Sequence, residues 1–113
     1  METIIIIAVV AVFLIWRFKP TKGIQNISTG QLKQIINDKD KVFVDVRTKG
    51  EFKSRNIPQF KNIPLGSDLS KLPKDKEIIV ICQSGMRSSQ ACKQLKKLGF
   101  TKVTNVRGGM SAY

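Results

Sequence analysis

The chain opens with an unbroken apolar run and then changes to short hydrophobic segments separated by polar ones. Residues 4–16 carry no polar side chain apart from the indole of Trp16, and counting Met1 and Phe18 the apolar stretch reaches about 18 residues. A membrane-spanning helix needs about 20 such residues, within a range of roughly 17 to 25. The pattern therefore predicts one transmembrane helix, in an N-terminal anchor over residues 1–19.

Basic residues flank this run on one side only. Arg17, Lys19 and Lys22 follow it, and no Lys or Arg precedes it. The positive-inside rule then places the rest of the chain in the cytoplasm. A cleaved signal peptide fits poorly, because Glu2 stands where a basic residue belongs and no A-x-A-like site follows. A buried core helix or a hairpin of β-branched strands is the alternative. We expect a single-pass protein of the cell membrane that contacts lipid through this helix.

The remainder of the chain has the composition of one folded domain. Pro20 and Gly23 interrupt the chain after the apolar run, so residues 20–27 are expected to form a linker and residues 28–113 a domain. The whole chain has 113 residues, which is the usual size of one domain. Hydrophobic residues make up 42% and charged residues 25%, a balance typical of globular proteins.

Helical patterns in the domain begin at polar capping residues. Ser28 with Gln31, and Thr48 with Glu51, have the spacing of capping boxes and predict two helix starts. A third helix is expected over residues 88–98, before Gly99, because its apolar positions form one stripe. That stripe consists of Ala91, Cys92, Leu95 and Leu98.

Continuous apolar runs mark the expected strands. Residues 42–46 and 77–81 are typical of strands buried on both faces, and residues 101–106 predict a last strand. Strands that alternate with helices imply crossover connections and a parallel sheet. The predicted fold class is α/β: an open parallel sheet flanked by helices on both faces, preceded by one transmembrane helix.

Charge and residue usage narrow the possible chemistry. The net charge is +12, from 20 Lys and Arg against 8 Asp and Glu, and it favours an anionic partner. Nucleic acid is not expected, because aromatic residues are not interleaved with the basic ones.

Histidine is absent, which excludes Cys-His and Ser-His dyads and His-containing zinc sites. No metal and no cofactor are expected. Two cysteines do not make a disulfide framework, and a reducing compartment is the simpler interpretation.

Cys82 comes directly after the strongest strand pattern and opens a loop to the third helix. In open α/β sheets, ligands bind beyond the carboxyl ends of the strands, where such loops direct backbone N–H groups at them. Gly85 permits positive φ, and Ser84 and Ser88 are small, so the loop is expected to curl around the sulfur. The helix N-terminus, the loop amides and Arg87 would then lower the thiol pKa and give a thiolate at neutral pH.

The segment Cys82-x-x-Gly85-x-Arg87-Ser88 resembles the active-site loop of the rhodanese family. Other motifs carry the same resemblance: Asp45-Val46-Arg47, Glu51-Phe52, Asn56-Ile57-Pro58, Ile63-Pro64-Leu65, Gly99-Phe100 and Val106-x-Gly108-Gly109. The resemblance implies a rhodanese-like sulfurtransferase that takes sulfane sulfur from a small anionic donor such as thiosulfate. A persulfide on Cys82 would pass that sulfur to a thiol or to cyanide. Cys82 and Arg87 would be catalytic, and an amide cradle would bind the substrate through Gln83, Ser84, Gly85, Met86 and Ser88.

Two other functions remain open. One is a Cys-based phosphatase or arsenate reductase of related fold, although four residues separate Cys82 from Arg87, as in rhodanese-like loops, and the related phosphatases carry one more. The other is a non-enzymatic sulfur carrier or regulatory module at the membrane. Cys92 lies on the apolar helix stripe and is expected to be a core thiol rather than a resolving cysteine. Structural ion pairing is expected of Asp45, Arg47 and Glu51.

Overall fold

A computed structural model describes residues 6–9 and 23–113 of the chain. Five parallel strands form one sheet in the order β1-β5-β4-β2-β3. The strands are β1 (Ile24–Ile27), β2 (Lys41–Asp45), β3 (Lys61–Asn62), β4 (Glu77–Ile81) and β5 (Val103–Val106). The helices are α2 (Thr29–Ile35), α3 (Lys49–Ser54), α4 (Met86–Lys97) and α5 (Gly109–Ala112). The predicted α/β class with a parallel sheet flanked by helices is confirmed.

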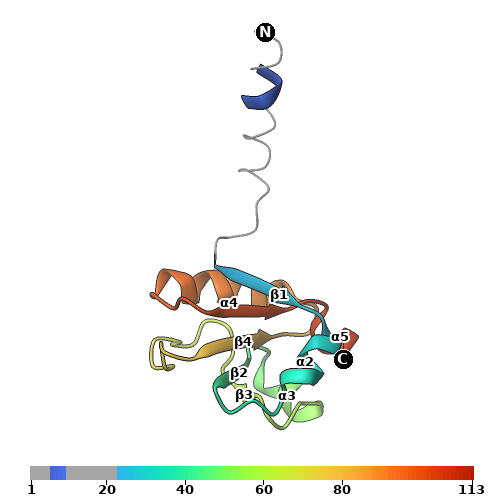
Figure 1. Ribbon diagram of the computed structural model, residues 1–113. Helices are drawn as coiled ribbons and strands as arrows, with labels where there is room; N and C mark the ends of the chain where they lie inside the picture. Colours follow the sequence, from blue (N-terminus) through green and yellow to red (C-terminus); the bar gives the residue numbers. More distant parts are fainter. Residues whose placement is uncertain (1–5, 10–22) are drawn as a thin grey trace.

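Helices cover both faces of the sheet and enclose two hydrophobic clusters. Figure 1 shows α4 running along the sheet beside β1, whereas α2 and α5 lie together near the C-terminus. On the α4 face, the cluster joins Val44, Val80 and Val103 to helix residues Ala91, Cys92 and Leu95. On the opposite face, Phe43, Ile79, Ile81 and Val106 pack with Leu32 and Met110. Burying each such large side chain contributes about 1.5–3 kcal/mol, so these clusters hold the sheet in place.

The first strand corrects the predicted linker. Residues 24–27, expected in the linker over residues 20–27, form β1 and pair in parallel with β5, from Ile24 opposite Val103 to Ile27 opposite Val106. Ile24 packs against the cluster on the α4 face and Ile27 against the other cluster. Four residues with two polar positions are too short a pattern to predict a strand. The strand forms because β5 offers an open edge for hydrogen bonding.

Both predicted capping boxes are confirmed. Ser28 accepts from the Gln31 N–H at 3.1 Å, and the Gln31 side chain accepts from the Ser28 N–H at 2.9 Å. At α3, Thr48 and Glu51 make the same reciprocal pair at 3.2 Å and 3.1 Å. Each box satisfies N–H groups that the first helical turn leaves unpaired, so these two helix starts are fixed by local sequence.

Helix α4 begins two residues earlier than the sequence pattern predicts. It starts at Met86, and its N-cap is Gly85 with φ of 103°, a left-handed conformation that favours glycine. The loop between Cys82 and the helix is therefore short. Met86 and Arg87, predicted to precede the helix, lie with Ser88 in the first turn of α4, where free backbone N–H groups point toward the carboxyl end of β4.

Within residues 6–9 and 23–113, none of the helices has the length and apolar character that crossing a membrane requires. The predicted anchor over residues 1–19 lies outside the described residues except for residues 6–9. Those four residues are helical, and Ile6, Ile7 and Val9 have exposed side chains.

Candidate active site around Cys82

Cys82 follows the last residue of β4, at the carboxyl edge of the sheet, and its side chain is wholly buried. The Gly85 N–H donates to its sulfur at 3.0 Å. Burial by itself would raise the pKa of the thiol, but the Ser88 hydroxyl and the N–H groups of Ser88, Gly85 and Ser84 outweigh burial and lower that pKa. Backbone and hydroxyl donors thus favour a thiolate without any histidine.

The carbonyl side of the same loop is held by α5. Cys82 O accepts from the Met110 N–H at 2.8 Å, and Gln83 O accepts from the Ser111 N–H at 3.0 Å. Gly109 permits this close approach, because a Cβ at that position would overlap the Cys82 carbonyl oxygen, and its φ of 56° also favours glycine. The N–H groups of α5 therefore hold the start of the loop on the side away from its sulfur-binding amides.

Arg87 is paired with Glu51 of α3. Its guanidinium donates to the two Glu51 carboxylate oxygens at 2.6 Å and 2.9 Å, and both side chains are about one-third exposed. Arg87, followed by the Thr48 backbone N–H, lowers the pKa of Glu51 to about 2, and Glu51 in turn raises the pKa of Arg87. Arg87, expected to contribute to the lowered pKa of Cys82, thus has its charge paired with the Glu51 carboxylate, and the bidentate pair attaches α4 to α3.

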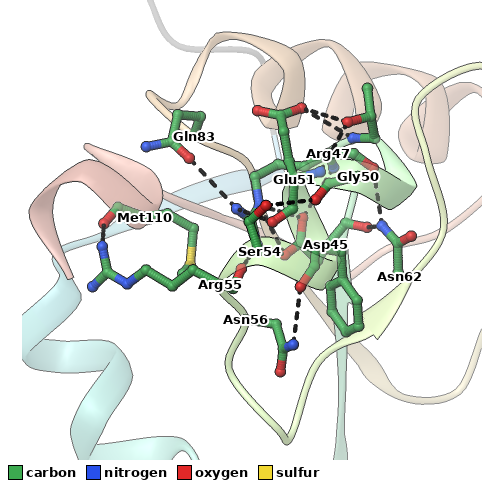
Figure 2. Close-up of polar contacts among 12 residues, drawn as sticks. Asp45, Arg47, Gly50, Glu51, Ser54, Arg55, Asn56, Asn62, Gln83 and Met110 are labelled. Atoms are coloured by element: carbon green, nitrogen blue, oxygen red, sulfur yellow. Dashed lines mark hydrogen bonds and ion pairs between the residues drawn. The ribbon is translucent and has the colours of Figure 1, made fainter.

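The buried Asp45–Arg47 pair helps to hold α3, and with it Glu51, in place. Arg47 Nη2 lies 2.8 Å from Asp45 Oδ2, and both side chains are almost completely buried. Arg47 also donates to the carbonyl oxygens of Glu51 at 3.3 Å and Arg55 at 2.6 Å, which fixes the end of α3 (Figure 2). Asp45 stands opposite Ile81 in the strand register, so this pair lies beside the nucleophile loop. The pair is structural, and removing one partner of such a buried pair typically costs about 3–5 kcal/mol.

The family model of the "Rhodanese-like domain" matches residues 28–113. The chain belongs to the rhodanese-like domain family. A relative from Bacillus subtilis, named "Putative sulfurtransferase YtwF", is 44% identical and aligns with 80% of this chain and 90% of its own. A protein from Allochromatium vinosum named "Sulfurtransferase" is 35% identical, over 80% of this chain and 88% of its own. These similarities support a sulfur-transfer function.

A solved structure supports the same assignment. The crystal structure of a rhodanese-like domain protein from Staphylococcus aureus superimposes with a TM-score of 0.70 at 33% identity, covering 78% of this chain and 89% of that one. The chain therefore has the rhodanese-like fold, and Cys82 occupies the loop between a central strand and its following helix.

Two of the predicted cradle residues direct their side chains away from the sulfur. Gln83 lies between Arg47, whose Nη1 is 3.5 Å from Gln83 Oε1, and Ser111, whose hydroxyl accepts from Gln83 Nε2 at 3.2 Å. Figure 2 shows Gln83 reaching toward Arg47. Met86 is 75% exposed. In this rhodanese-like domain, the Gln83 side chain ties the loop to its surroundings, and Met86 lies on the outer surface beside it.

Sequence reasoning missed several contacts to the loop, among them those of Asn105 and Gly109. Asn105 of β5 accepts a hydrogen bond from the Ser88 hydroxyl, although it is only 6% exposed. A signal was present, because a polar Asn inside an otherwise buried strand needs a hydrogen-bonding partner. Gly109 was part of the family motif, but its role follows only from its packing against Cys82. Neither contact can be inferred from residues close in sequence.

Cys92 is a core residue, as predicted. It is fully buried in the cluster on the α4 face, which also includes Cys82. Burial, followed by the negative charge at Cys82, raises the pKa of Cys92 to about 12. Cys92 is therefore protonated under ordinary conditions and is a poor nucleophile.

Proposed function

We propose that this rhodanese-like domain moves sulfane sulfur from a small anionic donor such as thiosulfate to a thiol or cyanide through a persulfide on Cys82. The observation that carries the proposal is the set of donors around the Cys82 sulfur, with the Gly85 N–H at 3.0 Å. Those donors lower the thiol pKa in a chain that has no histidine to act as a base. A buried thiolate surrounded by N–H groups suits an attack on sulfur that needs no proton transfer.

The transfer consists of two displacements at sulfur. The Cys82 thiolate attacks the outer sulfur of thiosulfate, an S–S bond forms, and the S–S bond of the donor breaks as sulfite leaves with the electron pair. An acceptor thiolate then attacks the outer sulfur of the persulfide and takes it, and the Cys82 thiolate leaves. The amides that stabilise the thiolate also lie where the charged outer sulfur of the persulfide would need donors.

Access to the sulfur requires the loop to move. The Cys82 side chain has no exposed surface, so a sulfur donor reaches it only when residues around the loop move. Persulfide formation on a buried sulfur also shields the intermediate from water.

Mass spectrometry tests this proposal directly. The full chain is incubated with thiosulfate and weighed, because β1 completes the sheet and should remain present. We expect the wild type to gain the mass of one sulfur, Cys82→Ser to gain none, and the matched Cys92→Ser to gain as much as the wild type. Release of sulfite and transfer to cyanide should follow the same order. An unmodified wild type that hydrolyses p-nitrophenyl phosphate would contradict the proposal and favour the phosphatase alternative.

A persulfide that forms but is not passed on would distinguish a carrier from an enzyme. In that case the wild type would gain one sulfur and keep it in the presence of cyanide or dithiothreitol. Catalytic turnover of thiosulfate with cyanide would instead support the enzymatic form of the proposal. Both results depend on Cys82, so the serine variant is the control for each.

We also propose that residues 1–19 attach the domain to the cell membrane, with the domain on the cytoplasmic side. The apolar run and the basic residues after it support this proposal, and the described part of the run exposes Ile6, Ile7 and Val9. Alkaline carbonate extraction of membranes should leave the chain in the pellet. Protease added to intact cells should leave the domain uncut. Complete release by carbonate would contradict a membrane span.

A further inference from the structure

A row of three polar side chains leads from the edge of the sheet to the nucleophile loop. Asn26 of β1 and Asn105 of β5 are register partners, and Asn105 Nδ2 donates to Asn26 Oδ1 at 3.1 Å. On its other side, Asn105 Oδ1 accepts from the Ser88 hydroxyl in the first turn of α4. Asn105 and Ser88 are buried. Asn26 precedes residues 28–113, to which the family model corresponds, so this row uses a residue outside the matched part.

The Ser88 hydroxyl has more acceptors than it can serve. It carries a single proton, and its hydrogen bonds run to the Gly85 carbonyl oxygen at 3.1 Å and to Asn105 Oδ1. The N–H of the same Gly85 binds the Cys82 sulfur at 3.0 Å, and a hydrogen bond from the Ser88 hydroxyl also lowers the pKa of that thiol. While the proton points to Asn105 or to Gly85, the sulfur receives no hydrogen bond from this hydroxyl. The direction of one O–H bond therefore changes how well the Cys82 thiolate is stabilised.

The Asn105 amide has a second orientation that frees this proton. When the amide turns over, its Nδ2 faces the Ser88 oxygen and donates to it, and the hydroxyl proton then points to the sulfur. Its Oδ1 then faces Asn26, whose amide turns as well and donates through Nδ2. The buried amide of Asn105 keeps two hydrogen bonds in both orientations, so neither orientation leaves it unpaired.

We propose that Asn105 is a positioning residue for the nucleophile, whose amide directs the Ser88 hydroxyl toward the Cys82 sulfur when that sulfur is charged and away from it when it is not. This inference rests on the proposed function, in which Cys82 alternates between thiolate and persulfide. In the persulfide the charge moves to the outer sulfur, about 2 Å farther along the S–S bond, so the hydroxyl returns to Asn105. When an acceptor removes the outer sulfur, the proton swings back and stabilises the departing Cys82 thiolate.

The charged and titratable groups near the Cys82 sulfur belong to other contacts. On α4 they are Arg87, paired with Glu51, and the protonated Cys92. Beyond the end of β2 lies the buried Asp45–Arg47 pair. Substituting Asn105 with a neutral side chain leaves all of these groups in place, so a change in the titration of Cys82 reports on the hydrogen bonds of Ser88.

The test measures the pH dependence of Cys82 alkylation by iodoacetamide in the full chain carrying Cys92→Ser. The substitution Asn105→Leu introduces a side chain of similar size that neither donates nor accepts hydrogen bonds. Ser88 should then keep its proton on the Gly85 carbonyl, a common partner for serine in a helix. We expect the alkylation midpoint to rise by up to about one pH unit, which corresponds to about tenfold less thiolate well below the midpoint. Thr104→Val, a buried residue of β5 that bonds to Glu77 instead, should leave the midpoint unchanged.

A second background shows whether Asn105 acts through Ser88. In Ser88→Ala, where the midpoint is already raised, adding Asn105→Leu should cause no further shift. An unchanged midpoint in Asn105→Leu, or an equal shift in the Ser88→Ala background, would overturn the proposal. If Asn105→Leu does not fold, the exposed Asn26→Ala substitution replaces it, and a midpoint equal to that of the parent chain would count against the proposal. Alkylation needs no sulfur donor, so its outcome is separate from the persulfide mass test.

Discussion

The two cysteines of this domain lie in the same buried cluster and have opposite chemistry. Both Cys82 and Cys92 are fully buried, yet the pKa of Cys82 is lowered and that of Cys92 is raised to about 12. Cys82 precedes α4, where N–H groups of the loop and first turn are free to donate to sulfur. Cys92 lies in the middle of the same helix, where the N–H groups are already paired along the helix. Burial alone makes a thiol inert, and position relative to the helix start reverses that effect.

The largest expected effect is a difference in alkylation between the two thiols of the native chain. At neutral pH, iodoacetamide should modify Cys82 and leave Cys92 untouched. The pKa of Cys82 is lowered and that of Cys92 is raised to about 12, so at neutral pH the thiolate fraction of Cys82 should exceed that of Cys92 by orders of magnitude. Peptide mapping after alkylation measures the ratio. In urea-unfolded chain both cysteines should react alike, and equal labelling of the native chain would contradict the comparison.

Gly109→Ala should disturb the Cys82 region and leave the Cys92 region intact. The added methyl group would overlap the Cys82 carbonyl oxygen at a backbone conformation that favours glycine. We expect a loss of about 1–3 kcal/mol in the free energy of unfolding in urea, together with slower persulfide formation.

Gly50→Ala is the matched control for this substitution. Gly50 lies in α3, and a Cβ there meets no atom within 4 Å. Its substitution should stabilise the domain by up to about 1 kcal/mol, because alanine has the higher helix propensity. Equal destabilisation by the two changes would show that Gly109 has no special role beside the loop.

Glu51→Gln should have the smallest effect, because the Glu51–Arg87 pair is partly exposed. The ionised Glu51 is bound by Arg87, so the folded-state pKa is about 2 against an ordinary value of 4.5. Its contribution to stability is complete above about pH 4.5 and is lost as the pH falls toward 2. We expect Glu51→Gln to cost about 1 kcal/mol or less at pH 7 and to flatten the loss of stability between pH 4.5 and 2.

Urea unfolding of both proteins at several pH values measures this difference. At about 1 M salt the difference between wild type and variant should shrink, because the pair is accessible to screening ions. A variant that loses stability on acidification as steeply as the wild type would show that Glu51 is not the group responsible.

The elements that depend on nearby residues could be predicted from the sequence. The capping boxes at Ser28 and Thr48 lie within single helical turns, and β4 is an apolar run buried on both sides. β1 and β3 could not be predicted, because each forms a strand only by pairing with a neighbouring strand. β1 pairs with β5, and the two residues of β3 pair with Val44 and Asp45 of β2. Their own patterns are too short to separate a strand from a loop.

The candidate site divides in the same way. The position of Cys82, and the donors expected from Ser84 to Ser88, follow from a strand, a short loop and a helix start. The ion-pair partner of Arg87 could not be predicted from local sequence, because Glu51 lies 36 positions away in the chain. Asn105 and Gly109 reach the loop from β5 and α5, so their contacts follow from the packing of the sheet and the C-terminal helix. Sequence patterns identify the nucleophile, and only the fold identifies what restrains it.

The pairing of β1 with β5 also determines which strand edge of the sheet is exposed to other chains. A fragment cut at the family boundary before residue 28 would leave the backbone of β5 unpaired along its outer edge. Such an edge is a template for strands of other chains and promotes aggregation. β1 covers it with a strand of the same length, four residues, and presents the polar and exposed side chains of Gln25 and Asn26 at the new edge. The segment that precedes residue 28 thereby also protects the edge of β5 from pairing with strands of other chains.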